Sequence, residues 1–328
     1  MALKSGHYLT RYLRPLRPWL DEDGVSEISI NEPGSVWIEA AGKPREMFEV
    51  PELTADLLEQ LSRQIAAATD QIVNPEKPLL SAALPTGERV QVVAPPAAPN
   101  GFAFSIRKQV LRSMTLDDYA KQGAFETTRL SRTAELSDEV IELKKLLSKN
   151  KVHEFLTKAV QSHQNIVISG GTLTGKTTFL NALLQEIPLD ERIITIEDTR
   201  EVNAPHGNML NLIAAKGDQG KALITIQDLL EATLRLRPDR IILGELRGKE
   251  AYTFLRAINT GHPGSICTLH ADSPKGAIDQ LSLMVLQANL GLSRDEIKDY
   301  VESMIDIVIQ LKREGSRRYI SAIQFKHA

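Results

Sequence analysis

Residues 170–177 read Gly-Gly-Thr-Leu-Thr-Gly-Lys-Thr, between an apolar run at 165–169 that is typical of a strand and residues 178–186 that are typical of a helix. Gly170 and Gly175 permit backbone conformations that a Cβ would penalise, so consecutive N–H groups turn inward. Such N–H groups at the start of a helix surround the phosphates of a nucleotide, and the helix dipole adds to the attraction. The sequence therefore predicts a phosphate-binding loop. A surface turn rich in glycine and threonine would not explain the lysine or the strand–helix context.

The loop also assigns roles to individual side chains. Lys176 is expected to reach the β and γ phosphates of ATP, and the hydroxyl of Thr177 is expected to ligate the Mg²⁺ ion that bridges them. The predicted nucleotide-binding residues are Gly170, Gly171, Thr172, Thr174, Gly175, Lys176, Thr177 and Thr178.

Length, charge and cysteine content exclude several classes of protein and site. The chain has 328 residues, which suits two domains that each bury a core, and its net charge of −3 provides no overall positive field for a nucleic acid. We therefore expect no direct sequence-specific nucleic-acid binding. The single cysteine, Cys267, excludes an intramolecular disulfide and a multi-cysteine zinc site. His262 and His270 lie near it in the sequence, but no fourth ligand does, so we expect no zinc.

The sequence predicts a cytoplasmic protein, because it shows no signal peptide and no apolar run near the roughly 18 residues that span a bilayer. Its first residues combine bases with interleaved apolar side chains, a pattern that suits peripheral contact with an anionic membrane. Pro15 and Pro18 interrupt the pattern, so an arm that is solvated or contacts a subunit is an equally open interpretation. The residues concerned are Lys4, Arg11, Arg14 and Arg17 with Leu9, Leu13, Leu16 and Trp19.

The pattern of runs divides the chain into three parts. Residues 1–108 predict a small α+β amino-terminal domain, with strands at 25–30, 36–39, 47–50, 89–93 and 102–107 and a helix at 53–68. Residues 109–150 are polar and predict a long linker that ends in a helix at 138–147. Residues 151–328 alternate helices and strands, which predicts an α/β domain with a parallel sheet. Its strands are expected at 166–169, 192–197, 209–213, 240–243, 265–269, 305–311 and 319–324, and its helices include 226–236, 249–258 and 275–288.

Polar groups that suit phosphoryl transfer follow three of these strands. Glu197 and Asp198 end one strand, where a parallel sheet opens onto its ligand crevice. Glu245 follows residues 240–244 in the manner of a Walker B segment, with Glu in place of the usual Asp. His270 follows another apolar run, where it is expected to sense or polarise the γ phosphate.

The order of these motifs carries a family resemblance. Gly-Gly-Thr-x-Thr-Gly-Lys-Thr-Thr, Ile-Glu-Asp-Thr-x-Glu, Arg-Pro-Asp-Arg-Ile-Ile-Leu-Gly-Glu-Leu-Arg and Thr-Gly-His-x-Gly-Ser-x-x-Thr-x-His-Ala resemble the Walker A, Asp box, atypical Walker B and His box of the secretion ATPase superfamily. Amino-terminal segments such as Phe-Ser-Ile-Arg-Lys resemble its branch of VirB-operon ATPases of bacterial type IV secretion systems. The single cysteine cannot build the tetracysteine zinc module usual in the type II relatives.

The resemblance implies a hexameric ring on the cytoplasmic face of the inner membrane, whose RecA-like carboxy-terminal domains hydrolyse ATP to drive substrate transfer or pilus assembly. The implied partners are other inner-membrane secretion ATPases and the coupling protein of the same system. Carried over by motif, Glu197 polarises the attacking water, Glu245 supports Mg²⁺ or that water, and His270 couples to the γ phosphate. Arg107 is implied to reach the nucleotide from the amino-terminal domain. Further candidates, each of which has an ion pair as its alternative, are Arg89, Arg235, Arg237, Arg240 and Arg247.

Three other functions use the same loop. A DNA-translocating RecA-like motor is the main alternative, against which the acidic balance and the 5% aromatic content argue. A small-molecule kinase and a nucleotide-binding scaffold that never turns over are the others. For the ATPase, loss of the γ phosphate is expected to release an arginine of one domain or subunit, which lets the amino-terminal domain swing on the linker.

Overall fold

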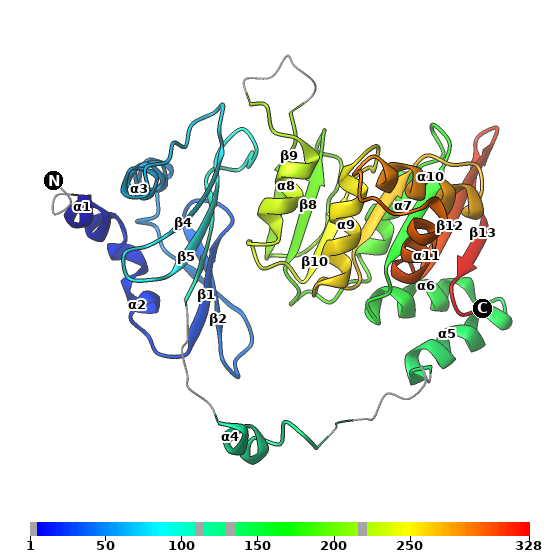
Figure 1. Cartoon of the computed structure of the whole chain (residues 1–328), viewed down its shortest axis with the longest axis horizontal. Coiled ribbons are helices and arrows are strands. Elements are labelled where there is room, and N and C mark those ends of the chain that lie inside the picture. The colour runs from blue at the N-terminus through cyan, green and yellow to red at the C-terminus, as the bar shows by residue number, and fades with distance from the viewer. Residues whose placement is uncertain (1–4, 109–114, 127, 129–135, 216–221) are drawn as a thin grey trace.

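The computed structural model describes residues 5–108, 115–126, 128, 136–215 and 222–328, and it forms two β-sheets. Figure 1 shows the amino-terminal sheet with its helices on one side of the molecule and the larger carboxy-terminal sheet on the other. The predicted α/β class with a parallel carboxy-terminal sheet is confirmed. Within the described ranges, no helix is both long and apolar enough to cross a bilayer.

The amino-terminal sheet is antiparallel, with the strand order β3-β2-β1-β6-β5-β4. Helix α3 (Ala55–Ala68) begins where the Thr54 hydroxyl accepts a hydrogen bond from the Leu57 N–H. The strands are β1 (Val25–Ile30), β2 (Ser35–Ala40), β3 (Glu46–Glu49), β4 (Leu79–Ala83), β5 (Arg89–Val93) and β6 (Ala103–Arg107). Strand β4 was not predicted, because its sequence Leu-Leu-Ser-Ala-Ala has no β-branched residue and pairing with β5 defines it.

The first described residues form α1 (Ser5–Tyr12) and α2 (Arg17–Leu20), joined by a short 3₁₀ turn. Leu9, Leu13 and Leu16 are buried in the amino-terminal core together with residues of α3 and β1. These leucines are therefore not free to enter a lipid surface, and the predicted membrane-facing apolar stripe is wrong for them. Arg11, Arg14 and Arg17 are exposed, whereas Lys4 lies outside the described residues.

The carboxy-terminal sheet has the order β13-β12-β7-β11-β10-β8-β9 and is parallel except for β13, which returns antiparallel to β12. The predicted strands are all present, with ends within three residues of the expected ones. They are β7 (Ile166–Gly170), β8 (Ile193–Glu197), β9 (Met209–Ile213), β10 (Arg240–Leu243), β11 (Ile266–Leu269), β12 (Ile307–Glu314) and β13 (Arg317–Phe325).

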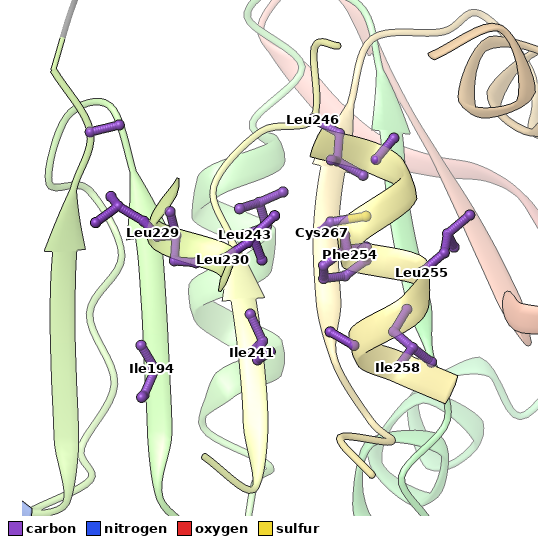
Figure 2. Close-up of a cluster of buried hydrophobic side chains, with 14 of the residues drawn as sticks. Ile194, Leu229, Leu230, Ile241, Leu243, Leu246, Phe254, Leu255, Ile258 and Cys267 are labelled. Atoms are coloured by element: carbon purple, nitrogen blue, oxygen red, sulfur yellow. The ribbon is translucent and has the colours of Figure 1, made fainter. Parts of the chain in front are cut away.

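Two apolar layers cover this sheet. Alternate residues of the strands face α8 (Ile226–Thr233), α9 (Glu250–Asn259), α10 (Pro274–Leu286) and α11 (Arg294–Met304). The other face packs on α5 (Asp138–Ser148), α6 (Val152–Gln161) and α7 (Lys176–Leu184). Figure 2 shows part of the first layer, where Leu230 of α8 and Phe254 of α9 lie near Leu243 of β10 and Cys267 of β11. Burial of both faces explains why the central strands β7, β8, β10 and β11 are mostly apolar.

Helix α5 falls within the segment predicted as linker. Its Val140 and Leu143 are buried in the layer that also contains Phe155 of α6 and Ile166 of β7. The short helix α4 (Leu116–Lys121) lies in Figure 1 on the path between the two sheets. The predicted boundaries at residues 108 and 150 remain a prediction, and the packing of α5 favours placing the second boundary before residue 138.

The two sheets meet through polar contacts and an apolar strip. The buried Arg192 guanidinium at the start of β8 donates to Asn31 at 2.8 Å, and Arg45 of the amino-terminal domain pairs with Asp239. Ala97 and Ala98 pack into the same layer as Leu210 of β9. The amino-terminal domain therefore rests on the β9 edge of the carboxy-terminal sheet, and any swing on the linker must break these contacts.

Replacing Leu143 by Ala tests the role of α5. Leu143 is 0% exposed, so the truncation leaves a cavity and should lower the free energy of unfolding of the carboxy-terminal domain by about 2–5 kcal/mol. Ile141→Ala on the exposed side of the same helix is the control, with an expected change within about 0.5 kcal/mol. Urea unfolding followed by circular dichroism measures both. Equal effects of the two variants would show that α5 belongs to a loose linker.

Candidate nucleotide-binding and hydrolysis site

The backbone of the loop between β7 and α7 requires glycine at two positions. Gly175 has a φ of +87°, and a Cβ on Gly170 would lie 2.5 Å from the Thr174 hydroxyl oxygen and 3.0 Å from the Leu311 carbonyl oxygen. The Thr174 hydroxyl donates to the Gly171 carbonyl at 2.9 Å and closes the loop. Both Gly170 and Gly175 are thus sterically needed, which supports the interpretation of this stretch as a phosphate loop.

A cavity of about 390 Å³ opens over the loop and α7. Five of the predicted nucleotide-binding residues, Thr174–Thr178, line it together with Glu197, Glu245 and Arg247. Gly171 and Thr172 instead line an adjoining hollow beside β12, and Gly170 is buried at the end of β7. The structure thus brings together residues that follow β7, β8 and β10 at one edge of the sheet.

Lys176 lies at the start of α7 and folds back over the loop. Its Nζ donates to the carbonyl oxygens of Gly170 at 3.1 Å and Gly171 at 3.3 Å, and it lies 3.4 Å from Nδ1 of His270. Burial lowers the pKa of Lys176, and the charge of Arg247 lowers it further, against the opposing effect of Glu245. An anion bound here would stabilise the charged ammonium, because it would offset the desolvation.

Glu197 ends β8 and is 3% exposed. One carboxylate oxygen, Oε1, accepts hydrogen bonds from the N–H groups of Glu201 and Val202, both at 2.9 Å. The other, Oε2, is buried and has no hydrogen-bond partner among the described residues. Burial raises the pKa of Glu197, although the two N–H groups oppose the shift. A fixed carboxylate with one free oxygen and a raised pKa has the properties of a general base.

Glu245 links Arg247, which lines the cavity, to His270, which lies beside the cavity. Its Oε1 lies 2.7 Å from Nε2 of His270, and its Oε2 accepts from Arg247 at 2.5 Å. Arg247 also donates to Asp198 at 2.7 Å. His270 therefore lies next to both Glu245 and Lys176, as the prediction that it couples to the γ phosphate requires. Glu197, Glu245 and His270 are close to the loop, and their catalytic roles remain a prediction.

Arg107 does not line this cavity. It ends β6, where its Nε lies 3.3 Å from Glu27, and its side chain lines a separate pocket of about 410 Å³ with Arg89 and Arg235. Within one chain, Arg107 is therefore not placed to bind a nucleotide on the loop. Its predicted role requires either a neighbouring subunit or a different domain arrangement.

The other candidate arginines separate clearly. Arg247 lines the cavity, whereas Arg237 pairs with Glu39 of the amino-terminal domain at 2.9 Å. Arg240 is fully buried, and its guanidinium donates to both oxygens of Glu191 at 2.6 and 2.8 Å. For Arg237, Arg240 and Arg247 the ion-pair alternative describes what the structure shows.

The candidates for zinc ligands have other surroundings. Cys267 is buried in the apolar layer, which raises the pKa of its thiol. Nδ1 of His262 lies 2.9 Å from the Pro238 carbonyl oxygen, and His270 pairs with Glu245. In the described part of the chain, no three His, Cys, Asp or Glu side chains are arranged as a metal cluster.

The residues present fit a Mg²⁺–nucleotide pair. The Thr177 hydroxyl and the Glu245 carboxylate line the same cavity, and they are two oxygen ligands of the kind that Mg²⁺ takes when phosphates and waters supply the rest. The free Oε2 of Glu197 and the loop residue Lys176 in the same cavity are further features that such a pair would use.

Thr268 and Arg318 are among the cavity residues that the sequence did not predict as site residues. Thr268 of β11 donates its hydroxyl to the Gly244 carbonyl at 2.6 Å and so ties the strand that carries Glu245 to its neighbour. Arg318 of β13 reaches the cavity from a strand far along the chain. No local motif marks Arg318, because it lies in a hairpin rich in bases and only the strand order brings it to the loop.

Comparison with known proteins finds similarity along nearly the whole chain. Residues 12–319 match the model of the family described as type II/IV secretion system protein. The chain is 39% identical to the type IV secretion system protein VirB11 of Bartonella henselae, over 95% of this chain and 91% of that protein. It is 38% identical to the type IV secretion system protein PtlH of Bordetella pertussis, over 96% and 94% of the two chains.

A solved structure agrees along the full length. The VirB11 ATPase of the Brucella suis type IV secretion system, crystallised with sulphate, superposes with a TM-score of 0.93 at 38% identity and covers 99% of this chain and 96% of its own. Sequence and structure thus match the same kind of protein across both domains. This chain belongs to the type II/IV secretion system protein family.

Proposed function

We propose that this protein is the ATP-hydrolysing motor of a bacterial type IV secretion system, which couples hydrolysis to substrate translocation or pilus assembly. The observation that carries the proposal is the single cavity in which the loop residues Lys176 and Thr177 meet Glu197 and Glu245. Full-length similarity to VirB11 and PtlH proteins and the superposition on a VirB11 ATPase support the same function.

Each residue has a task in this reaction. Lys176 and the loop N–H groups bind the phosphates, and Glu197 orients and deprotonates the attacking water through its free Oε2. Thr177 and Glu245 would hold Mg²⁺, which neutralises charge on the phosphate oxygens when it is bound. His270, 2.7 Å from Glu245 and 3.4 Å from Lys176, connects the metal ligand to the lysine and so responds to the γ phosphate.

We further propose that the chain works as a homo-hexamer at the cytoplasmic face of the inner membrane, alongside other secretion ATPases and the coupling protein. The pocket that holds Arg107, Arg89 and Arg235 supports an assembly, because three guanidinium groups with one buried carboxylate, Glu27, form a site for an anion that this chain does not itself supply. The γ phosphate of a neighbour's ATP is that anion in this proposal.

The alternatives receive less support. The relatives that match over the full length are secretion proteins, which favours a secretion motor over a DNA-translocating motor. The carboxylate of Glu197 promotes attack by water, which a small-molecule kinase must suppress. Release of inorganic phosphate without an added acceptor separates the ATPase from both the kinase and the non-hydrolysing scaffold.

Lys176→Ala removes the cation that binds the β and γ phosphates. We expect the rate of ATP hydrolysis to fall at least about 100-fold and secretion to be lost, since this charge is needed in the transition state. Lys249→Ala, on an exposed side chain outside the cavity, should retain both activities. Phosphate release and a secretion assay in a complemented deletion strain are the measurements. Secretion that persists in the Lys176→Ala strain would support the scaffold.

Glu197→Gln keeps the hydrogen bonds to Oε1 but removes the base. We expect kcat to fall about 10²–10⁴-fold while the Kd of ATP stays near the wild-type value. In the wild type, the raised pKa of Glu197 means that kcat declines on acidification at a higher pH than an ordinary glutamate would give. This acidic limb should vanish in the variant. Glu231→Gln on the exposed side of α8 serves as the control, and an unchanged pH profile in Glu197→Gln would exclude Glu197 as the base.

Arg107→Ala tests action between subunits. If Arg107 binds a neighbour's nucleotide, Arg107→Ala and Lys176→Ala chains should each be inactive alone and partly active when mixed. Mixing restores activity because some interfaces then pair an intact Lys176 with an intact Arg107. Phosphate release from mixtures of the two purified variants is the measurement. A mixture as inactive as its components would show that Arg107 does not act on the neighbouring subunit.

A further inference from the structure

The carboxy-terminal hairpin brings a cation to the nucleotide cavity. Strands β12 and β13 carry four basic residues around the turn, and Lys312 and Arg313 line the adjoining hollow beside the loop. Among the cations of this fully described hairpin, Arg318 alone lines the cavity that contains Lys176. The hairpin therefore contributes one specific charge to the site.

The stem of Arg318 is held against the loop. A Cβ on Gly175 would lie 3.0 Å from the Cδ of Arg318. The absence of a side chain at Gly175 therefore makes room for Arg318, and it also permits the φ of +87°. The neighbouring Arg317 projects to the opposite face, where its guanidinium lies 5.2 Å from the ring centre of Tyr319. Two adjacent arginines thus have different surroundings, and only one faces the loop.

No described residue neutralises the charge of Arg318. No hydrogen bond or ion pair joins its guanidinium to another side chain in the described ranges, whereas Arg247 across the cavity is paired with both Glu245 and Asp198. An unpaired guanidinium beside the N-terminus of α7 adds to a positive field for an anion. Its planar donors match two oxygens of a phosphate better than an ammonium would.

Strand order fixes the side of the loop from which Arg318 approaches. The hairpin lies on one side of β7, while β11 and β10, which carry His270 and Glu245, lie on the other. Arg318 thus approaches at Gly175, where the loop backbone cradles the α and β phosphates, and not at the side of Glu245 and Arg247. A group placed there contacts phosphates that ADP and ATP share.

We propose that Arg318 is a substrate-binding residue that contacts the α and β phosphates and contributes equally to the affinity for ADP and ATP. This inference rests on the proposed nucleotide site. Because the contact is the same before and after hydrolysis, Arg318 supplies uniform binding and leaves the chemical step unchanged. It would retain ADP on the ring after the γ phosphate has left, in contrast to groups that act only on the triphosphate.

Binding of ADP, a non-hydrolysable ATP analogue and inorganic pyrophosphate to the full-length protein tests the proposal. For Arg318→Ala we expect the Kd of all three ligands to rise by a similar factor of about 10, the size of a lost hydrogen bond to a charged group. Arg318→Lys, which keeps the charge but loses the fork, should have an intermediate effect. Arg317→Ala is the matched control and should bind all three ligands as the wild type does.

The outcomes separate the two proposals. If wild-type protein bound no nucleotide, the proposed function itself would fail. If the wild type binds and Arg318→Ala binds ADP equally well, only the role of Arg318 is refuted. A variant that weakens ADP but not pyrophosphate would show contact with the nucleoside, and one that weakens only the ATP analogue would show contact with the γ phosphate. Either result overturns the assignment to the α and β phosphates.

Discussion

Parallel pairing of β7, β11, β10 and β8 is the constraint on which the site depends. Each of these strands ends at the same edge of the sheet, so the residues that follow them meet over the loop although they are spread from Gly170 to His270. The pairing is held by two apolar layers, one under α8–α11 and the other under α5–α7. Burial of both faces therefore fixes the positions of Glu197 and Glu245 relative to Lys176, and local sequence alone does not.

The same burial sets the chemistry of the site. Glu197 is enclosed at the end of β8, where desolvation raises its pKa and two backbone N–H groups fix one oxygen. Lys176 is partly desolvated, which lowers the pKa of its ammonium group. A bound phosphate would therefore stabilise the charged form of Lys176, which the protein alone stabilises poorly. Burial thus shifts the pKa values of Lys176 and Glu197 in the directions that suit phosphate binding and general-base catalysis.

The two sides of the site carry different groups. Glu245, His270 and Arg247 form a connected network on the β10 and β11 side, suited to the γ phosphate and its metal. Arg318 approaches from the β13 side of the loop, where we propose that it meets the phosphates common to ATP and ADP. The pocket with Arg107, Arg89 and Arg235 lies apart from both, and the role proposed for Arg107 involves a nucleotide bound by a neighbouring subunit.

The sequence by itself determined the α/β class, the loop and the family, because strand–loop–helix context and motif order are local patterns. It also indicated Glu197, Glu245 and His270, since each follows an apolar strand. Only the tertiary structure placed Arg107 in a separate pocket, joined α5 to the carboxy-terminal core and buried the amino-terminal leucines. It also brought Arg318 to the loop. These features depend on contacts between segments distant in the chain, and no local periodicity or spacing records which of the possible partners a side chain will meet.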